Sequence, residues 1–273
     1  MSHREISQQH RSEVRFCRRL LESSRFREET SLFVFAGQRH FLRALEARYD
    51  WLRIYLCSRL LNNPAIRVAV KKLAACGVDV RYLSAEEYRL LDLEPRASGI
   101  AAIAKQRWVL PESIDFQRQR LWMAISQVRN PGNLGTLLRS ATAFGCDGVL
   151  LTEETTSPFS SNVLKASMGA VYHLRFARVT IQWLKQVHKE HSAAIIGTTP
   201  HADNCLDALP FEQPMIVFLG EERAGLTSEQ LAVCHQQIRI HMEPSADSLN
   251  LGVAGSLFLH EIYSRRRTRL CHP

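Results

Sequence analysis

The sequence has no long apolar run of the kind that a membrane helix or a secretory signal requires. Its longest wholly apolar runs fall far short of the roughly 20 residues that cross a bilayer, so we expect no transmembrane helix. Residues 1–19 are polar and rich in arginine, without the apolar core of a signal peptide. Glu5, Glu13 and Glu22 argue against a transit peptide. We therefore expect a cytoplasmic location.

Several motifs of common enzyme classes are also missing. The seven cysteines contain no C-x-x-C pair, and no H-E-x-x-H segment occurs, so neither a disulfide framework nor a metal centre is indicated. The chain has no G-x-G-x-x-G fingerprint of a nicotinamide dinucleotide site. It also lacks the G-x-S-x-G elbow of the serine hydrolases.

Arginine, by contrast, is abundant at both ends of this 273-residue chain, which has a formal net charge of +8 and an isoelectric point of about 9.3. Such a balance is typical of a protein that binds a polyanion such as RNA. The alternative is that these arginines only cover solvent-exposed helix faces and chain ends. The residues concerned are Arg11, Arg15, Arg18, Arg19, Arg25, Arg27, Arg265, Arg266, Arg267 and Arg269.

Short apolar runs alternate with helical segments in residues 1–107, which predicts a compact α/β domain. We expect its strands at residues 32–36, 52–57, 78–83 and 100–104, and its helices at residues 5–23, 40–48 and 65–76. Ser84 and Glu87 form a capping box that predicts one more helix. Residues 108–120 contain Pro111 and mixed charges without an apolar period, so we expect a linker there.

Residues 121–273 repeat the alternation and predict a second α/β domain. We expect strands at residues 121–125, 148–151, 193–198, 215–219 and 238–242, and helices at residues 130–144, 183–190 and 249–263. Strands that are apolar throughout and separated by helices favour a mostly parallel sheet covered on both faces.

Three segments that follow strands of this domain hold its most distinctive residues: 130–139 (NPGNLGTLLR), 219–226 (LGEERAGL) and 248–250 (SLN). Open α/β sheets place ligand sites at strand ends, so the segments predict a binding site. Each also has a plainer alternative. Arg139 could pair with a surface carboxylate, Gly220 could belong to an ordinary loop, and Ser248 could cap the last helix.

Two further features of this domain concern spacing. Asn133 and Arg139 lie six residues apart on one helix, and we expect both to face one side, where an arginine can bind phosphate. Gly252, Ala254, Gly255 and Ser256 are unusually small residues for a helix interior. They predict close packing against another backbone, either of a dimer partner or of a chain that passes tightly through the fold.

The order and type of the three segments resemble the signature motifs of the SpoU (TrmH-like) branch of the SPOUT RNA methyltransferases, over residues 121–267. Residues 1–107 are similar, in a strand-Gly-helix opening and in residues 98–103, to the small α/β RNA-binding domain that often precedes it. The resemblance implies a SPOUT-type sheet with a carboxyl-terminal trefoil knot, S-adenosyl-L-methionine as cofactor and a homodimer. It also implies methyl transfer to a ribose 2′-hydroxyl of RNA, with rRNA preferred over tRNA.

The resemblance assigns roles to individual residues. It implies that Arg139 is catalytic, helped by Asn133, Glu222, Ser248 and Asn250. The residues that it implies for cofactor binding are Gly197, Thr198, Leu219, Gly220, Ile240, Met242 and Leu249. Arginine is a poor base because its pKa exceeds 12, so Arg139 either assists an RNA phosphate that removes the hydroxyl proton or only positions phosphate and ribose.

Three residues depart from the pattern of the family without touching the catalytic set. Ser126 stands where many members have an acidic residue, Thr136 where many have alanine, and His241 where proline is common. Two other functions stay open at this point. One is a non-catalytic RNA-binding or ribosome-assembly factor on the same fold, and the other is a small-molecule α/β enzyme that uses a nucleotide.

Overall fold

The computed structural model describes residues 3–91, 96–153, 155–209, 214–246 and 248–271 of the chain. The chain divides into two compact units. The first takes in Met1–Gln106 and Phe159–Tyr172, and the second takes in Arg107–Pro158 and His173–Pro273. A short segment from the second half of the sequence thus belongs with the amino-terminal unit. The domains expected from the sequence, residues 1–107 and 121–273, are each continuous and do not include this segment in the first.

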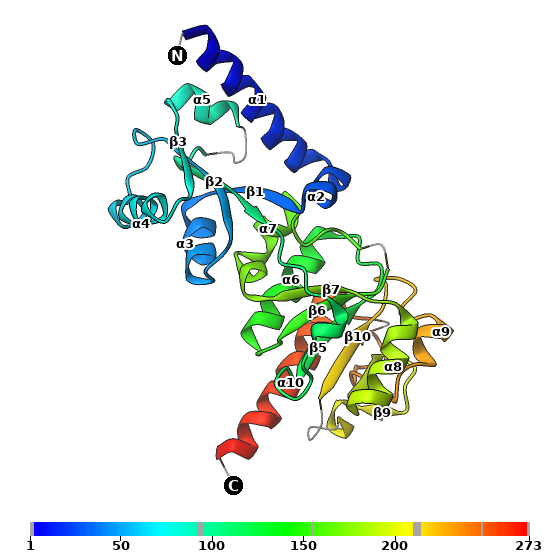
Figure 1. The fold of residues 1–273 in the computed structure, drawn as a ribbon. Coiled ribbons are helices and arrows are strands. Elements are labelled where there is room, and N and C mark those ends of the chain that lie inside the picture. Colours follow the sequence, from blue (N-terminus) through cyan, green and yellow to red (C-terminus); the bar gives the residue numbers. More distant parts are fainter. Residues whose placement is uncertain (1–2, 92–95, 154, 210–213, 247, 272–273) are drawn as a thin grey trace. The chain divides into compact units, whose positions relative to one another are not determined.

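The first unit is built on a four-stranded mixed sheet in the order β1-β4-β2-β3 (Figure 1). Its strands are β1 (Leu32–Ala36), β2 (Trp51–Leu56), β3 (Asp79–Tyr82) and β4 (Ile100–Lys105). Its helices are α1 (His3–Glu22), α2 (Ser24–Thr30), α3 (Gln38–Glu46), α4 (Pro64–Ala75), α5 (Ala85–Leu90) and α7 (Ser161–Ser167). β4 pairs antiparallel with β1 and β2, and β2 pairs parallel with β3.

Aromatic side chains bind the segment Phe159–Tyr172 into the core of the first unit. The ring centroids of Phe33 and Phe159 lie 5.0 Å apart, and those of Tyr49 and Tyr172 lie 5.3 Å apart. The Tyr172 hydroxyl is 3.3 Å from Nδ1 of His40, and burial lowers the pKa of this histidine to about 4. This core therefore favours a neutral imidazole.

The second unit contains a seven-stranded sheet in which every pair of neighbouring strands is parallel, in the order β7-β6-β5-β10-β8-β11-β9. The strands are β5 (Leu121–Ile125), β6 (Gly148–Leu151), β7 (Arg175–Arg178), β8 (Ala194–Thr198), β9 (Asn204–Cys205), β10 (Met215–Leu219) and β11 (Gln236–Arg239). The helices are α6 (Pro131–Ala143), α8 (Ile181–His191), α9 (Ser228–Leu231) and α10 (Leu251–Cys271). The predicted α/β class with a mostly parallel sheet is confirmed.

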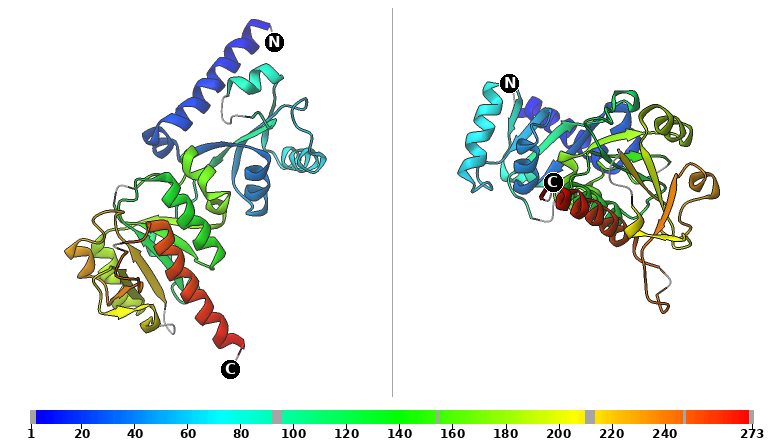
Figure 2. Two further views of the ribbon diagram at one scale, coloured as in Figure 1. Left: turned by 180° about the vertical axis from the view of Figure 1, so that it is seen from behind. Right: turned by 90° about the horizontal axis from the view of Figure 1, so that it is seen from below.

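Helices cover both faces of this sheet (Figure 2). Phe218 of β10 packs in a core with Leu184 and Val187 of α8. Its neighbour Leu219 points to the opposite face, where it lies against α10 at Gly255. This alternation follows from the two-residue period of a strand and explains why β10 is apolar throughout.

The small residues of α10 allow it to approach α6 closely. A Cβ atom at Gly255 would lie 2.3 Å from Leu137 Cδ2, and one at Gly252 would lie 3.1 Å from Thr136 Cβ. The hydroxyls of Ser140 and Ser256 are 2.6 Å apart across the same contact. The predicted close packing is seen, and its partner is a helix of the same chain, whose side chains rather than backbone lie nearest the glycines.

Some elements differ from those predicted from the sequence. The last strand was predicted at residues 238–242, but β11 ends at Arg239, because Gln236 and Gln237 pair with β8 while residues 240–242 leave the sheet. β7 and α7 were not predicted. The expected linker contains Ile114 and Phe116, both buried in the core of the second unit. Within the described chain, no helix combines the length and apolarity needed to cross a membrane.

Candidate active site

Four loops meet at one edge of the parallel sheet, where the neighbouring strands β5, β10, β8 and β11 have their carboxyl ends. From β5 the chain continues to β6 and β7 on one side, whereas β8 and β11 lie on the other side of β10. Such a reversal of strand order leaves a crevice that α/β proteins use for ligands. Two of the three predicted segments, residues 130–139 and 219–226, begin at this edge.

A chain of hydrogen bonds joins all three segments. Asn250 Nδ2 donates to Asn133 Oδ1 at 2.9 Å, and Asn133 Nδ2 donates to Glu222 Oε1 at 3.1 Å. The same carboxylate oxygen accepts the backbone N–H of Asn130 at 3.2 Å. Hydrogen-bonded pairs up to 117 positions apart in the sequence therefore form one network.

The two ends of this network fix the orientation of both asparagine amides. At one end, Asn250 Oδ1 accepts from the backbone N–H of Gly252 at 2.9 Å, so its nitrogen must face Asn133. At the other end, Glu222 in its ionised form can only accept, so Asn133 must present its nitrogen there. Replacing either amide by a carboxylate would leave one bond without a donor.

Asn250, rather than Ser248, caps α10. Its Oδ1 accepts from the N–H groups of Gly252 and Val253, at 2.9 Å and 3.4 Å. The plainer interpretation of Ser248 as a helix cap is therefore wrong, because α10 begins at Leu251, three residues beyond that serine. The interaction between an Asn250 cap and the first residues of the helix is the usual way to satisfy free N–H groups.

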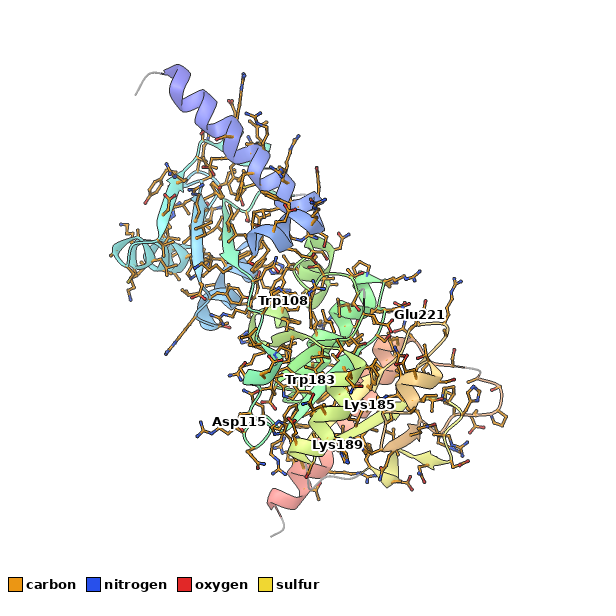
Figure 3. The ribbon with its side chains drawn as sticks, turned by 45° about the vertical axis from the view of Figure 1, so that its right-hand side comes forward. Trp108, Asp115, Trp183, Lys185, Lys189 and Glu221 are labelled. Atoms are coloured by element: carbon orange, nitrogen blue, oxygen red, sulfur yellow. The ribbon has the colours of Figure 1, made fainter. Side chains whose placement is uncertain are left out.

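The loop after β10 turns back tightly on itself. Glu221 and Gly225 exchange backbone hydrogen bonds of 3.0 Å and 3.1 Å, and Figure 3 labels Glu221 at the start of the turn. A Cβ atom at Gly220 would lie 2.1 Å from the carbonyl carbon of Gly225, so only glycine fits. The loop shape that presents Glu222 therefore depends on Gly220.

The loops after β8, β10 and β11, together with the start of α10, enclose a cavity of about 280 Å³. Of the residues predicted to bind a cofactor, the cavity is lined by Thr198, Gly220, Ile240, Met242 and Leu249. Glu222 and Ser248 also line it. Its wall is completed by Leu226 and by Phe258 of α10, two apolar residues that the sequence analysis did not single out.

Two of the predicted cofactor residues lie behind this cavity. Gly197 is buried in β8, where a Cβ atom would meet Cys234 Sγ at 2.7 Å. Leu219 is fully buried, and its backbone oxygen accepts from the N–H of Ser126 at 3.0 Å. Both support the strand ends without lining the cavity.

Arg139 is placed apart from the network. It is exposed on α6, is not among the lining residues, and has no hydrogen-bond or ion-pair partner in the described part of the chain. Six residues turn an α-helix by about 600°, which leaves Asn133 and Arg139 about 120° apart around the axis. The expectation that both side chains face one side does not hold, and the alternative of a pairing with a surface carboxylate is also not seen.

A second polar network, which the sequence analysis missed, lies behind the first. Gln230 Nε2 donates to Ser126 Oγ and to Glu153 Oε1, both at 2.9 Å, and the Gln127 side chain also donates to Glu153. Gln127 adopts a positive φ of 49°, which is uncommon for a residue with a side chain. Glu153, in the loop after β6, thereby joins the loop after β5 to α9. Only the unusual Ser126 hinted at it in the sequence.

Among the described residues, no group of three or more His, Cys, Asp or Glu side chains could hold a metal ion. His188 and His235 stack with ring centroids 3.3 Å apart, and His235 Nδ1 accepts the N–H of Ile195 at 3.1 Å. Burial lowers the pKa of His235, and the nearby His188 lowers it further.

A parallel sheet with a loop-built cavity at its switch point defines the class of α/β ligand-binding domains. Within that class, a sequence profile of the SpoU rRNA Methylase family matches residues 120–260. This match covers just over half of the chain, and the chain therefore belongs to this family.

Individual relatives agree with this membership. A Synechocystis protein named as an uncharacterized tRNA/rRNA methyltransferase is 28% identical over 87% of this chain, and the chain spans less than two thirds (64%) of its length. The 23S rRNA (guanosine-2′-O-)-methyltransferase RlmB of Coxiella burnetii is 31% identical over 75% of this chain and 84% of its own. The AdoMet-bound rRNA methyltransferase of Sinorhizobium meliloti superposes with a TM-score of 0.83 at 26% identity, over 92% of this chain and 94% of its own.

Proposed function

We propose that this protein transfers a methyl group from S-adenosyl-L-methionine to a ribose 2′-hydroxyl of RNA, with rRNA preferred over tRNA. The observation that carries the proposal is the hydrogen-bonded set Asn133, Glu222 and Asn250, which unites the three family segments beside the cavity. The names of the Coxiella and Sinorhizobium relatives support rRNA as the substrate. A cytoplasmic location follows from such a substrate.

The lining of the cavity fits this cofactor. Ile240, Met242 and Leu226 offer an apolar wall suited to an adenine ring. Residues 198–201 and 220–225 supply backbone groups suited to polar atoms of the nucleoside and the amino acid. When bound, S-adenosyl-L-methionine supplies a methyl group that its sulfonium already activates. No metal is required for this chemistry.

The remaining task of the protein is to orient the ribose hydroxyl and help remove its proton. Arg139 is exposed and without a carboxylate partner in the described chain, so its guanidinium is free to bind an RNA phosphate bidentately. A guanidinium keeps its proton in proteins, so an arginine is a poor base. We therefore assign Arg139 to positioning phosphate and ribose, with the phosphate as proton acceptor, and Glu222 to holding both asparagines.

The active form is proposed to be a homodimer. Leu249, just before α10, and Val253 and Leu257 of α10 recur every four residues and are 37%, 46% and 40% exposed. A stripe of large apolar side chains at this spacing suits a second copy of the chain. Arg139 lies on α6, the helix against which α10 packs, and a partner subunit beside this stripe would account for its position outside its own cavity.

Calorimetric titration with S-adenosyl-L-methionine tests the assignment of the cavity. Met242→Asp should weaken binding at least tenfold, because it places a carboxylate in the apolar wall, whereas Glu243→Gln is the matched control outside the lining. Wild-type protein that binds no cofactor, or a Met242→Asp variant that binds as the wild type does, would contradict the proposed site. Transfer of labelled methyl groups to total RNA then tests the activity itself.

A further inference from the structure

A second cavity, of about 650 Å³, lies entirely within the first unit. It is enclosed by α1, by the end of β3 and by α5, which Figure 1 shows beside α1. Nothing in the proposed methyl transfer uses it. Its lining combines three arginines of α1 with an apolar wall, so a ligand of this cavity must carry both negative charge and an apolar surface.

The charge of this cavity is positive once internal pairing is counted. Glu13 receives the Arg53 guanidinium at 2.6 Å and the Tyr55 hydroxyl at 2.5 Å, and Glu87 accepts the backbone N–H of Ser84 at 2.8 Å. The Arg53 guanidinium offsets the charge of Glu13, whereas the backbone hydrogen bond leaves the charge of Glu87 in place. Three arginines against this one carboxylate still leave the lining with a net positive charge.

Arg11, Arg15 and Arg18 form a row along α1 on one side of the cavity. All three are exposed, and none has a carboxylate partner among the side chains that the structure describes. Seven residues of helix extend about 10 Å, so the row can contact more than one phosphate of a nucleic-acid backbone. A single small anion would not need such a length.

The opposite wall of the cavity is apolar. Leu83 and Leu91 line it, together with Leu90, which is 57% exposed. A large aliphatic side chain in this position offers a surface for a planar apolar face. A base attached to a phosphate backbone presents such a face and negative charge together, which neither a lipid-like molecule nor a free phosphate does.

We propose that this cavity binds an unpaired nucleotide of the RNA substrate, with its base against Leu90 and the adjoining phosphates on Arg11, Arg15 and Arg18. The inference rests on the proposed function, because it assigns a substrate-binding site to the first unit. It predicts that recognition includes a single-stranded segment, since a base within a duplex cannot reach an apolar wall.

The salt dependence of RNA binding tests the two walls separately. The logarithm of the affinity of the full-length protein for a fluorescent single-stranded RNA oligonucleotide is measured against the logarithm of the salt concentration. The triple variant R11Q/R15Q/R18Q should reduce the slope by about 2, because each single-strand phosphate contact contributes about 0.7. Leu90→Ala should lower the affinity about tenfold while leaving the slope unchanged. Arg25→Gln, on α2 and outside the cavity, is the matched control.

Thermal melts and near-UV circular dichroism of the same samples show that the first unit of each variant remains folded, and affinity for S-adenosyl-L-methionine is measured beside them for the second unit. If the wild type binds the oligonucleotide but the triple variant retains its slope, or Leu90→Ala retains its affinity, the cavity does not bind RNA and the proposed function stands. If the wild type binds neither RNA nor S-adenosyl-L-methionine, the proposed function fails and this inference fails with it.

Discussion

Asn133→Asp tests the network that unites the three motif segments, because the change is nearly isosteric. The new carboxylate still accepts from Asn250 Nδ2, but it has no hydrogen to donate to Glu222 Oε1, 3.1 Å away. A hydrogen bond to a charged group is lost, which costs about 1.5–3 kcal/mol. Two carboxylates at this separation also repel by about 1–3 kcal/mol at the high dielectric of partly exposed side chains.

The effect of this substitution should depend on pH. Each carboxylate raises the pKa of the other in the folded state, so the variant is stable below the ordinary carboxyl pKa and loses that stability as the pH rises through the raised folded pKa. At low pH a shared proton restores the missing donor. Asn133→Ala removes the same donor without adding charge and serves as the control.

Urea unfolding at pH 5 and pH 8 measures this difference. We expect Asn133→Asp to be about 2–4 kcal/mol less stable than the wild type at pH 8, less stable than Asn133→Ala, and substantially recovered at pH 5. An equal deficit at both pH values, or no deficit at pH 8, would refute the hydrogen-bond direction assigned to Asn133.

Four other outcomes are expected. Arg139→Ala should lower kcat at least 100-fold and change the Kd for S-adenosyl-L-methionine less than twofold in calorimetry, and an unchanged kcat would remove its role. The free energy of unfolding of the wild type should fall by about 3 kcal/mol as the pH drops from 6.5 towards 4, because His40 takes up a proton in the unfolded chain but stays neutral when buried in the folded one. In thermal melts, His40→Phe should flatten this dependence on pH. Gly220→Ala should destabilise the fold by about 3 kcal/mol in urea unfolding, because the new Cβ atom would collide with the backbone at Gly225. If this variant is as stable as the wild type, the loop relaxes freely. Leu257→Glu should yield monomers in sedimentation experiments, and a retained dimer would place the interface elsewhere.

For strands in which every side chain is apolar, both the first and the last residue could be predicted from the sequence. Residues 32–36, 121–125, 148–151 and 215–219 are strands in the structure with those limits. The edge strand Arg175–Arg178 escaped prediction because its two exposed arginines interrupt the apolar pattern. Pairing with a neighbour, which is a tertiary property, decides such strands.

The candidate site was predictable as a set of segments, but its internal contacts were not. The sequence indicated Asn133, Glu222 and Asn250 through the family resemblance, yet only the fold shows that they share hydrogen bonds. Glu153 could not be found, because its partners Ser126, Gln127 and Gln230 come from the loop after β5 and from α9. The trefoil knot that the resemblance implies stays a prediction, since residue periodicity carries no information on how a chain threads.

The most direct test of the central claim is nucleoside analysis after methyl transfer. The protein is incubated with S-adenosyl-L-methionine carrying a labelled methyl group and with unmodified rRNA or tRNA, and the RNA is then digested to nucleosides. The account predicts label in a 2′-O-methyl nucleoside from the rRNA sample, which Arg139→Ala abolishes. Label only on a base, or no label in free RNA or in ribosomal subunits although the cofactor binds, would contradict it.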